Sequence, residues 1–197
     1  MSNTLSRKEQ IKKLTVGAVL MAIVIVLQLL GSFIRFGPFS VSLVLIPIVI
    51  GAAICDAKVS TILGFTFGVA VLLSGDAAAF MQFDVFGTIV TVLLKGTLAG
   101  LAAGLVYKAL EKVNIYCAII LSALVCPIVN SGVFVLGCVV FFFEDLAAWA
   151  PAGQGTFKYI ILGLVGANFI FEVISNMILS PVVVKVFNVL KKEFANN

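Results

Sequence analysis

Two charged residues inside long apolar runs are the first candidates for chemistry in this sequence. Lys95 lies within the run 85–107, and Glu172 lies within the run 157–187. An unpaired charge near the middle of a bilayer costs on the order of 3 kcal/mol on insertion scales, so both side chains are expected to face the protein interior. Counted from one common surface, their depths differ by less than about one helical turn. Either they form a mutual ion pair, or they line a polar cavity in which the ammonium meets a substrate carboxylate.

Three amide side chains are expected at a similar depth. Asn130 follows Pro127, Asn168 lies in the last run, and Asn176 follows Glu172 by four residues, on the same helix face. Such amides often hydrogen-bond between helices in lipid. Several amides around one charged pair also suit a polar small molecule. The sequence leaves both interpretations open.

Other reactive sites find no support in the residues. The chain has no histidine, which removes imidazole ligands and Ser–His or Cys–His nucleophiles. No C-x-x-C spacing relates its four cysteines, which are interpreted as small core residues: Cys55, Cys117, Cys126 and Cys138. A phosphate-binding G-x-x-x-x-G-K-[ST] loop is also missing. We therefore expect no enzyme, metal site or cofactor, and any ATP-driven function requires partner subunits.

The composition identifies the elements that must hold these residues. Of 197 residues, 62% are hydrophobic and 11% are charged, against about 45–50% and 25% in soluble domains. A bilayer accommodates that much apolar surface, and a crossing helix needs about 20 apolar residues. The chain is predicted to be an integral membrane protein.

Hydropathy divides the chain into six apolar runs that follow a basic segment, residues 1–13. The runs are 14–32, 39–55, 59–74, 85–107, 116–143 and 157–187. Backbone in lipid requires helices or a closed barrel, and the alternation of a barrel is missing. We expect one all-α domain, residues 1–197, with six transmembrane helices. The second and third runs are short for full crossings, so they are tilted or end in a buried loop.

Lysine and arginine are distributed unevenly between the two sides of this arrangement. With a cytoplasmic N-terminus, only Arg35 and Lys158 lie outside, and Lys95 lies within a span. The remaining basic residues lie on the inside: Arg7, Lys8, Lys12, Lys13, Lys58, Lys108, Lys112, Lys185, Lys191 and Lys192. The positive-inside rule then places both termini in the cytoplasm. Orientation in the cell membrane, rather than nucleic-acid binding, accounts for the net charge of +4.

Small residues recur at helical spacing in two of the runs. Gly96, Gly100 and Gly104 lie four residues apart, which favours close helix packing in lipid. Ala18 and Ala22 form an A-x-x-x-A step in the first run. Aromatic residues gather toward the outer ends of the spans, as an interfacial belt or as a lid over a pocket: Phe80, Phe83, Phe86, Phe141, Phe142, Phe143, Trp149, Phe157 and Tyr159.

Together these features resemble the substrate-binding S components of energy-coupling factor (ECF) transporters. The resemblance rests on six spans in a short chain, the basic N-terminus, the alanine step, residues 36–42 leading into 46–51, and residues 95–100. It implies capture of a water-soluble vitamin or related micronutrient at the membrane of a bacterium. The partners would be a transmembrane coupling subunit and two cytoplasmic ATPases.

The resemblance also implies roles for individual residues. Ala18 and Ala22 match the family's docking motif for the coupling subunit. The family's pocket, near the outer face, corresponds here to regions that contain these candidate substrate-binding residues: Arg35, Lys95, Asn130, Asn168, Glu172 and Asn176.

The motifs look most similar to those of pantothenate-type members. Residues 38–43, the basic residue before the glycines, and Pro127-x-x-Asn130-Ser131 carry that likeness. Riboflavin is the second choice, and the aromatic-rich pocket of thiamin members is not evident. Two other classes remain open: a self-sufficient secondary transporter with Glu172 or an acidic loop residue as a proton site, and a membrane scaffold without a ligand.

Overall fold

The computed structural model describes residues 7–32, 35–36, 39–40 and 43–195. In this part the chain is almost entirely helical, with one antiparallel pair of two-residue strands, β1 (Arg35–Phe36) and β2 (Phe39–Ser40). The longer helices are α1 (Arg7–Gly31), α2 (Leu45–Ile54), α3 (Ala57–Leu73), α5 (Val85–Leu110), α6 (Ile115–Phe141) and α9 (Ala167–Ala195). Shorter elements are α4 (Ala78–Met81), α7 (Phe143–Trp149), α8 (Thr156–Lys158) and the π-helix η1 (Tyr159–Gly166), which continues into α9.

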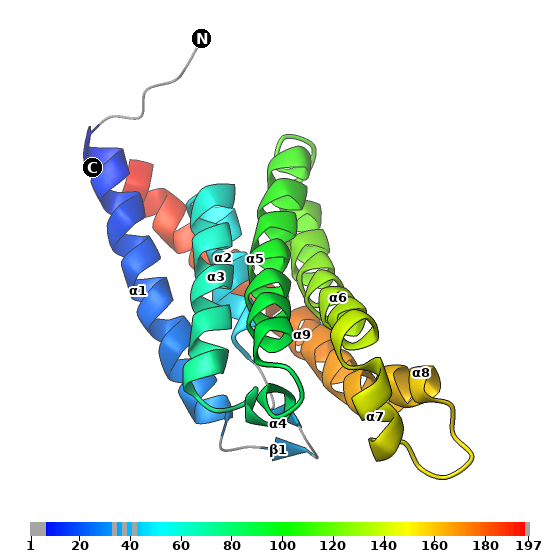
Figure 1. Cartoon of the computed structure of the whole chain (residues 1–197). Coiled ribbons are helices and arrows are strands. Elements are labelled where there is room, and N and C mark those ends of the chain that lie inside the picture. Colours follow the sequence, from blue (N-terminus) through cyan, green and yellow to red (C-terminus); the bar gives the residue numbers. More distant parts are fainter. Residues whose placement is uncertain (1–6, 33–34, 37–38, 41–42, 196–197) are drawn as a thin grey trace.

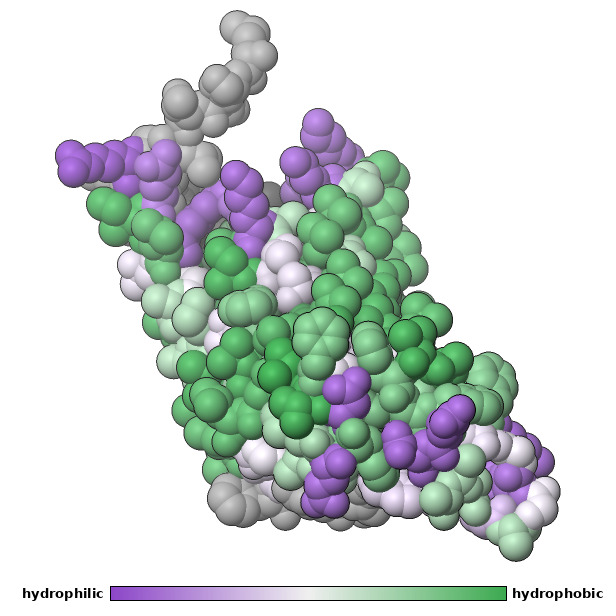
Figure 2. All heavy atoms as spheres, viewed as in Figure 1, coloured by the Kyte–Doolittle hydropathy of each residue, from purple (hydrophilic) through white to green (hydrophobic). Residues whose placement is uncertain are grey.

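The helices form one bundle with two distinct ends. The beginning of α1 and the end of α9 lie at the same end (Figure 1), together with the α2–α3 and α5–α6 joints, and we call it the terminal end. The opposite end, which carries β1, β2, α4 and α7, is called the hairpin end. Hydrophobic residues cover most of the middle of the visible face, and hydrophilic residues gather mainly toward the two ends (Figure 2). This banding suits a bilayer around the middle.

Among the described residues, four segments are long and apolar enough to cross a membrane: Gln10–Gly31, Val85–Leu110, Ile115–Phe141 and Thr156–Val189. The helices α2 and α3 are shorter, with 10 and 17 residues. At a rise of about 1.5 Å per residue, α2 extends only about 15 Å, half of the hydrocarbon thickness. The sequence predicted a helix over residues 39–55. In the structure β2 occupies the start of this run, and the helix begins only at Leu45. Pro47 is tolerated there because the first turn leaves its backbone nitrogen without a partner.

Side-chain caps fix where three of the long helices begin. The Asp56 carboxylate accepts a hydrogen bond from the Val59 amide at 2.9 Å, and that of Asp84 accepts one from the Phe86 amide at 2.9 Å. Asn114 caps α6 in the same way. These residues satisfy amides that lack partners in the first helical turn. The caps set the register of the residues that follow on α3, α5 and α6.

Glycines bring α3 and α5 into backbone contact. A Cβ atom added at any of three α5 glycines would overlap α3. The glycines Gly96, Gly100 and Gly104 lie against Gly64, Ser60 and Ala57, respectively. The Ser60 hydroxyl also donates to the Gly100 carbonyl at 2.8 Å. This close packing fixes the position of Lys95, the residue before the first of these glycines.

Candidate functional site

A small cavity near the hairpin end contains both charged residues of the spans. Its volume is about 50 Å³. Six helices contribute to its wall, which is lined by Gln28, Phe67, Val71, Asp76, Ala77, Phe80, Val92, Lys95, Phe134, Asn168 and Glu172. We call it the hairpin-end cavity. It brings together side chains that are more than 140 residues apart in the sequence, from Gln28 to Glu172.

Lys95 lies over two aromatic rings on one side of this cavity. Its Nζ atom is 5.0 Å from the ring centroid of Phe134 and 5.6 Å from that of Phe67. Such cation–π contacts attract an ammonium group in a partly desolvated site. Within the part of the chain that the structure describes, Lys95 forms no ion pair, although its charge interacts with those of Glu172 and Asp76. The two charges of the spans therefore share a cavity without touching.

Glu172 is held by amides from two helices. Only 2% of its surface is exposed. The Asn130 Nδ2 atom, on α6, lies 3.2 and 3.4 Å from the two carboxylate oxygens, and the Asn168 Nδ2 atom donates to Oε1 at 3.0 Å. The π-helix η1 ends at Gly166, directly before the turn that carries Asn168, and the wider π turn sets the register of that turn. A buried carboxylate needs such donors because water does not solvate it.

A second polar group on the wall was not predicted from the sequence. Gln28, on α1, donates from Nε2 to the Asp76 carboxylate at 2.5 Å and to the Ser74 hydroxyl at 3.3 Å. Asp76 follows Gly75, whose φ of +80° makes the turn after α3. One signal for this link was present, since Gln28 is an amide within an apolar run. The link attaches the end of α1 to the cavity wall.

Aromatic rings from distant segments pack against Phe80, which lines the hairpin-end cavity. The ring centroid of Phe80, on α4, lies 5.4 Å from that of Phe134 and 5.3 Å from that of Phe142. Trp149, on α7, packs against Phe83 with the ring centroids 4.9 Å apart and the ring planes tilted by 58°. The sequence analysis named Phe80, Phe83, Phe142 and Trp149 as members of an interfacial belt or of a lid over a pocket, and of these Phe80 lies in the cavity lining.

The predicted substrate residues fall into three groups. Lys95, Asn168 and Glu172 line the cavity, and Asn130 contacts Glu172 from behind. Asn176 is 3% exposed and lies outside the lining, with no hydrogen-bond partner for its Nδ2 atom in the described part of the molecule. Arg35 lies in β1, but its side chain is outside what the structure describes.

The predicted docking residues lie elsewhere on the surface. Ala18 and Ala22 are exposed on α1, whereas Leu20, Val24 and Gln28 of the same helix are buried. The alanine step therefore faces away from the bundle. Among the described residues, no group of three or more acidic or cysteine side chains is placed to hold a metal ion.

Comparisons with known proteins agree with this architecture. The solved structure of ThiT from Listeria monocytogenes superposes with a TM-score of 0.67 and 20% sequence identity, over 90% of this chain and 98% of that one. This likeness concerns the fold. No curated protein matches the chain. The family profile described as "ECF transporter, substrate-specific component" matches residues 12–184. Because that match covers most of its length, the chain belongs to the family of substrate-specific components of ECF transporters.

Proposed function

We propose that this protein captures a small water-soluble vitamin, or a related micronutrient, in the hairpin-end cavity for ATP-driven import. One observation carries the proposal: Lys95 and Glu172 line the same cavity, and neither neutralises the other by direct contact. If Lys95 and Glu172 only held the helices together, they would stabilise the fold most at ion-pair distance, where their Coulomb attraction is largest. Separated charges with amide donors beside them suit a ligand that carries complementary polar groups.

The cavity must enlarge to admit such a ligand. Its volume of about 50 Å³ is small beside the roughly 300–1,000 Å³ of ordinary ligand pockets. The short helix α4 bears Phe80, which lines the cavity, and α7 bears Trp149, whose ring lies 6.2 Å from that of Phe80. Glycines with positive φ lie in the turn before α4, Gly75 at +80°, and in the loop after α7, Gly153 at +83°. We infer that α4 and α7 move outward to admit the substrate and return over it.

The identity of the vitamin rests on two features that favour different ligands. The sequence motifs favour pantothenate, whose carboxylate would face Lys95. The rings of Phe67, Phe80 and Phe134 favour a ligand with a flat ring, because offset stacking and edge contacts add to the buried area. Riboflavin satisfies the second feature, and so does thiamin, whose positive charge would face Glu172. Pantothenate remains the first candidate, with the two aromatic vitamins as alternatives.

Co-purification tests the proposed capture directly. The chain is purified in detergent from cells grown in rich medium, and small molecules released on denaturation are identified by mass spectrometry. One vitamin at near-stoichiometric yield is the expected result, and calorimetry with pantothenate, riboflavin and thiamin then ranks the ligands. A Lys95→Met, Glu172→Gln double variant serves as the control and should release none. Retention of the same molecule by this variant would place binding elsewhere.

The energy source separates this proposal from a self-sufficient transporter. The chain lacks a phosphate-binding loop, so ATP-driven import needs a coupling subunit and ATPases. We expect substrate to accumulate in vesicles only when these partners are reconstituted together with the chain. Accumulation by the chain alone under a proton gradient would support a secondary transporter instead.

A further inference from the structure

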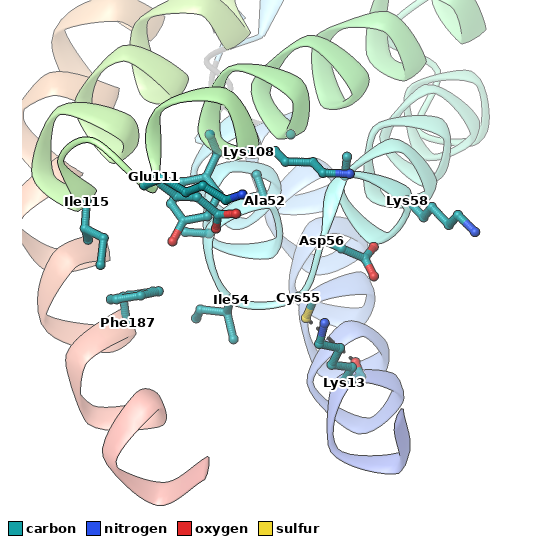
Figure 3. A pocket seen from close by; sticks show the side chains of 15 residues that line it. Lys13, Ala52, Ile54, Cys55, Asp56, Lys58, Lys108, Glu111, Ile115 and Phe187 are labelled. Atoms are coloured by element: carbon teal, nitrogen blue, oxygen red, sulfur yellow. Dashed lines mark hydrogen bonds between the residues drawn. The ribbon is translucent and has the colours of Figure 1, made fainter. Parts of the chain in front are cut away.

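A much larger cavity, of about 740 Å³, lies at the terminal end of the bundle (Figure 3). Its wall is formed where α2, α3 and α5 meet, with additional side chains from α1, α6 and α9. No residue of its lining belongs to the hairpin-end cavity. The substrate proposed above therefore leaves this terminal-end cavity unexplained.

Positive charge predominates around the terminal-end cavity. Its lining includes four lysines, Lys13, Lys58, Lys108 and Lys112, and two carboxylates, Asp56 and Glu111. Among the described residues, none of the four ammonium groups takes part in an ion pair or a side-chain hydrogen bond. One Asp56 oxygen is already used to cap α3. The lysines come from three different helices and the α5–α6 joint, so the fold gathers them at one place.

Apolar side chains form the other part of the wall of the same cavity. Tyr107 and Phe187 are 6% and 8% exposed, and their ring centroids lie 6.4 Å apart. Figure 3 shows Ile115 and Phe187 on one side of the cavity, and Cys55, Asp56 and Lys13 on the other. The cavity therefore offers apolar walls below a basic rim. This arrangement matches a ligand with an anionic group joined to a hydrocarbon chain.

The geometry points to a binding site for the phosphate group of an anionic phospholipid in the terminal-end cavity. Val85–Leu110 and Ile115–Phe141, both long enough to cross a membrane, are joined at this end, which places the cavity at headgroup depth. Basic pockets between helix ends at a membrane face recognise such headgroups. Free phosphate shares the charge, but it would leave the apolar walls without contacts. A phospholipid uses both parts of the site.

Native mass spectrometry of the full chain in detergent tests this site. The probes are phosphatidylglycerol and phosphatidylcholine with identical acyl chains, so that only the headgroup differs. We expect the first phosphatidylglycerol to bind about tenfold more tightly than the first phosphatidylcholine, since each lysine near an anionic headgroup contributes about 1 kcal/mol and a tenfold preference corresponds to about 1.4 kcal/mol. Absence of that preference would overturn the proposal.

A pair of matched double variants locates the effect. Lys108→Gln with Lys112→Gln removes two charges from the cavity rim and should reduce the preference to below about threefold. Lys158→Gln with Lys185→Gln removes two charges at exposed positions outside the cavity and should leave the preference unchanged. Equal losses in both variants would show a diffuse charge effect and overturn the site.

Inorganic phosphate separates the two sources of the anion. At millimolar concentration it should not displace phosphatidylglycerol, because the acyl chains contribute part of the binding. The cavity would be assigned to free phosphate if two results were found together. Phosphate binding would be weakened by Lys108→Gln with Lys112→Gln, and the protein would show no preference for phosphatidylglycerol over phosphatidylcholine. That result would overturn the lipid assignment.

Discussion

The two cavities at opposite ends of the bundle differ in how their charged residues are held. At the hairpin end, Glu172 is 2% exposed and receives hydrogen bonds from two amides, while Lys95 lies over two rings. At the terminal end, Lys108 and Lys112 are exposed and unpaired among the described residues. Burying a charge is costly, so the fold supplies partners at the first site and none at the second.

This difference explains why cavity volume is a poor guide to the substrate site. The terminal-end cavity is about 740 Å³ and the hairpin-end cavity about 50 Å³. Exposed lysines at a membrane face serve orientation in most membrane proteins and cost little. A carboxylate and an ammonium within the spans cost several kcal/mol without partners, on the order of 3 kcal/mol each. We therefore assign capture to the smaller cavity.

The largest expected effect separates capture from coupling to ATP hydrolysis. Ala18→Trp with Ala22→Trp places two bulky side chains on the exposed step of α1, where close helix approach requires small residues. We expect ATP-dependent uptake by the reconstituted complex to be abolished and ligand affinity of the isolated chain to be unchanged. Uptake assays in vesicles and calorimetry measure the two properties.

A matched pair on another exposed face of α1 controls for bulk alone. Val19→Trp with Ile23→Trp has the same spacing, and both positions are exposed, at 55% and 40%. This variant should transport normally. If the two double variants behave alike, the alanine step is not the docking surface.

Next in size is the effect of removing a charge from the hairpin-end cavity. Lys95→Met should weaken binding of a carboxylate vitamin by about 2 kcal/mol or more, roughly thirtyfold, since one partner of a desolvated charge pair is lost. Folding should survive, because Glu172 keeps its hydrogen bonds from Asn130 and Asn168. Affinity and melting temperature are measured side by side for Lys95→Met, Glu172→Gln and the double variant. Equal affinities combined with coupled losses of stability would leave only a structural role.

A smaller effect, on the stability of the fold, is expected when the close packing of α3 and α5 is disturbed. Gly100→Ala would bring the new methyl group into the Ser60 carbonyl and should destabilise the chain by about 1–3 kcal/mol, the usual cost of overpacking. Gly132→Ala is the control, because a Cβ atom at Gly132, on α6, meets nothing within 4 Å. Thermal unfolding in detergent should separate the two variants. Similar melting temperatures would show that α3 and α5 separate at little cost.

The sequence predicted some parts of the hairpin-end cavity better than others. Lys95 and Glu172 were placed at one depth because helical rise converts residue counts into distances. Asn168 was expected near the same depth, whereas Asn176, placed on the Glu172 face by its i, i+4 spacing, lies outside the lining. Asp76 was missed as a lining residue, since it lies on a turn whose position depends on tertiary packing, and Phe80 was named only as part of a belt or of a lid over a pocket. The start of the second run was missed because apolarity alone does not distinguish a short strand from a helix.

The smallest expected effect comes from removing a negative charge, that of Asp56, from the terminal-end cavity. Asp56 both caps α3 and contributes one of the two carboxylates in that cavity. Asp56→Asn keeps a good capping residue and removes the negative charge, so it should leave stability nearly unchanged and raise the phosphatidylglycerol preference about threefold. Asn114→Ala provides the reverse case, since it removes the cap of α6 at a cost of about 1 kcal/mol without changing any charge. Native mass spectrometry should therefore show a changed lipid preference only for Asp56→Asn, and thermal unfolding should show a lower stability only for Asn114→Ala.

Vitamin affinity should stay constant in both variants, because neither residue lines the hairpin-end cavity. A change in vitamin affinity would mean that the two cavities are coupled through α3 or α6.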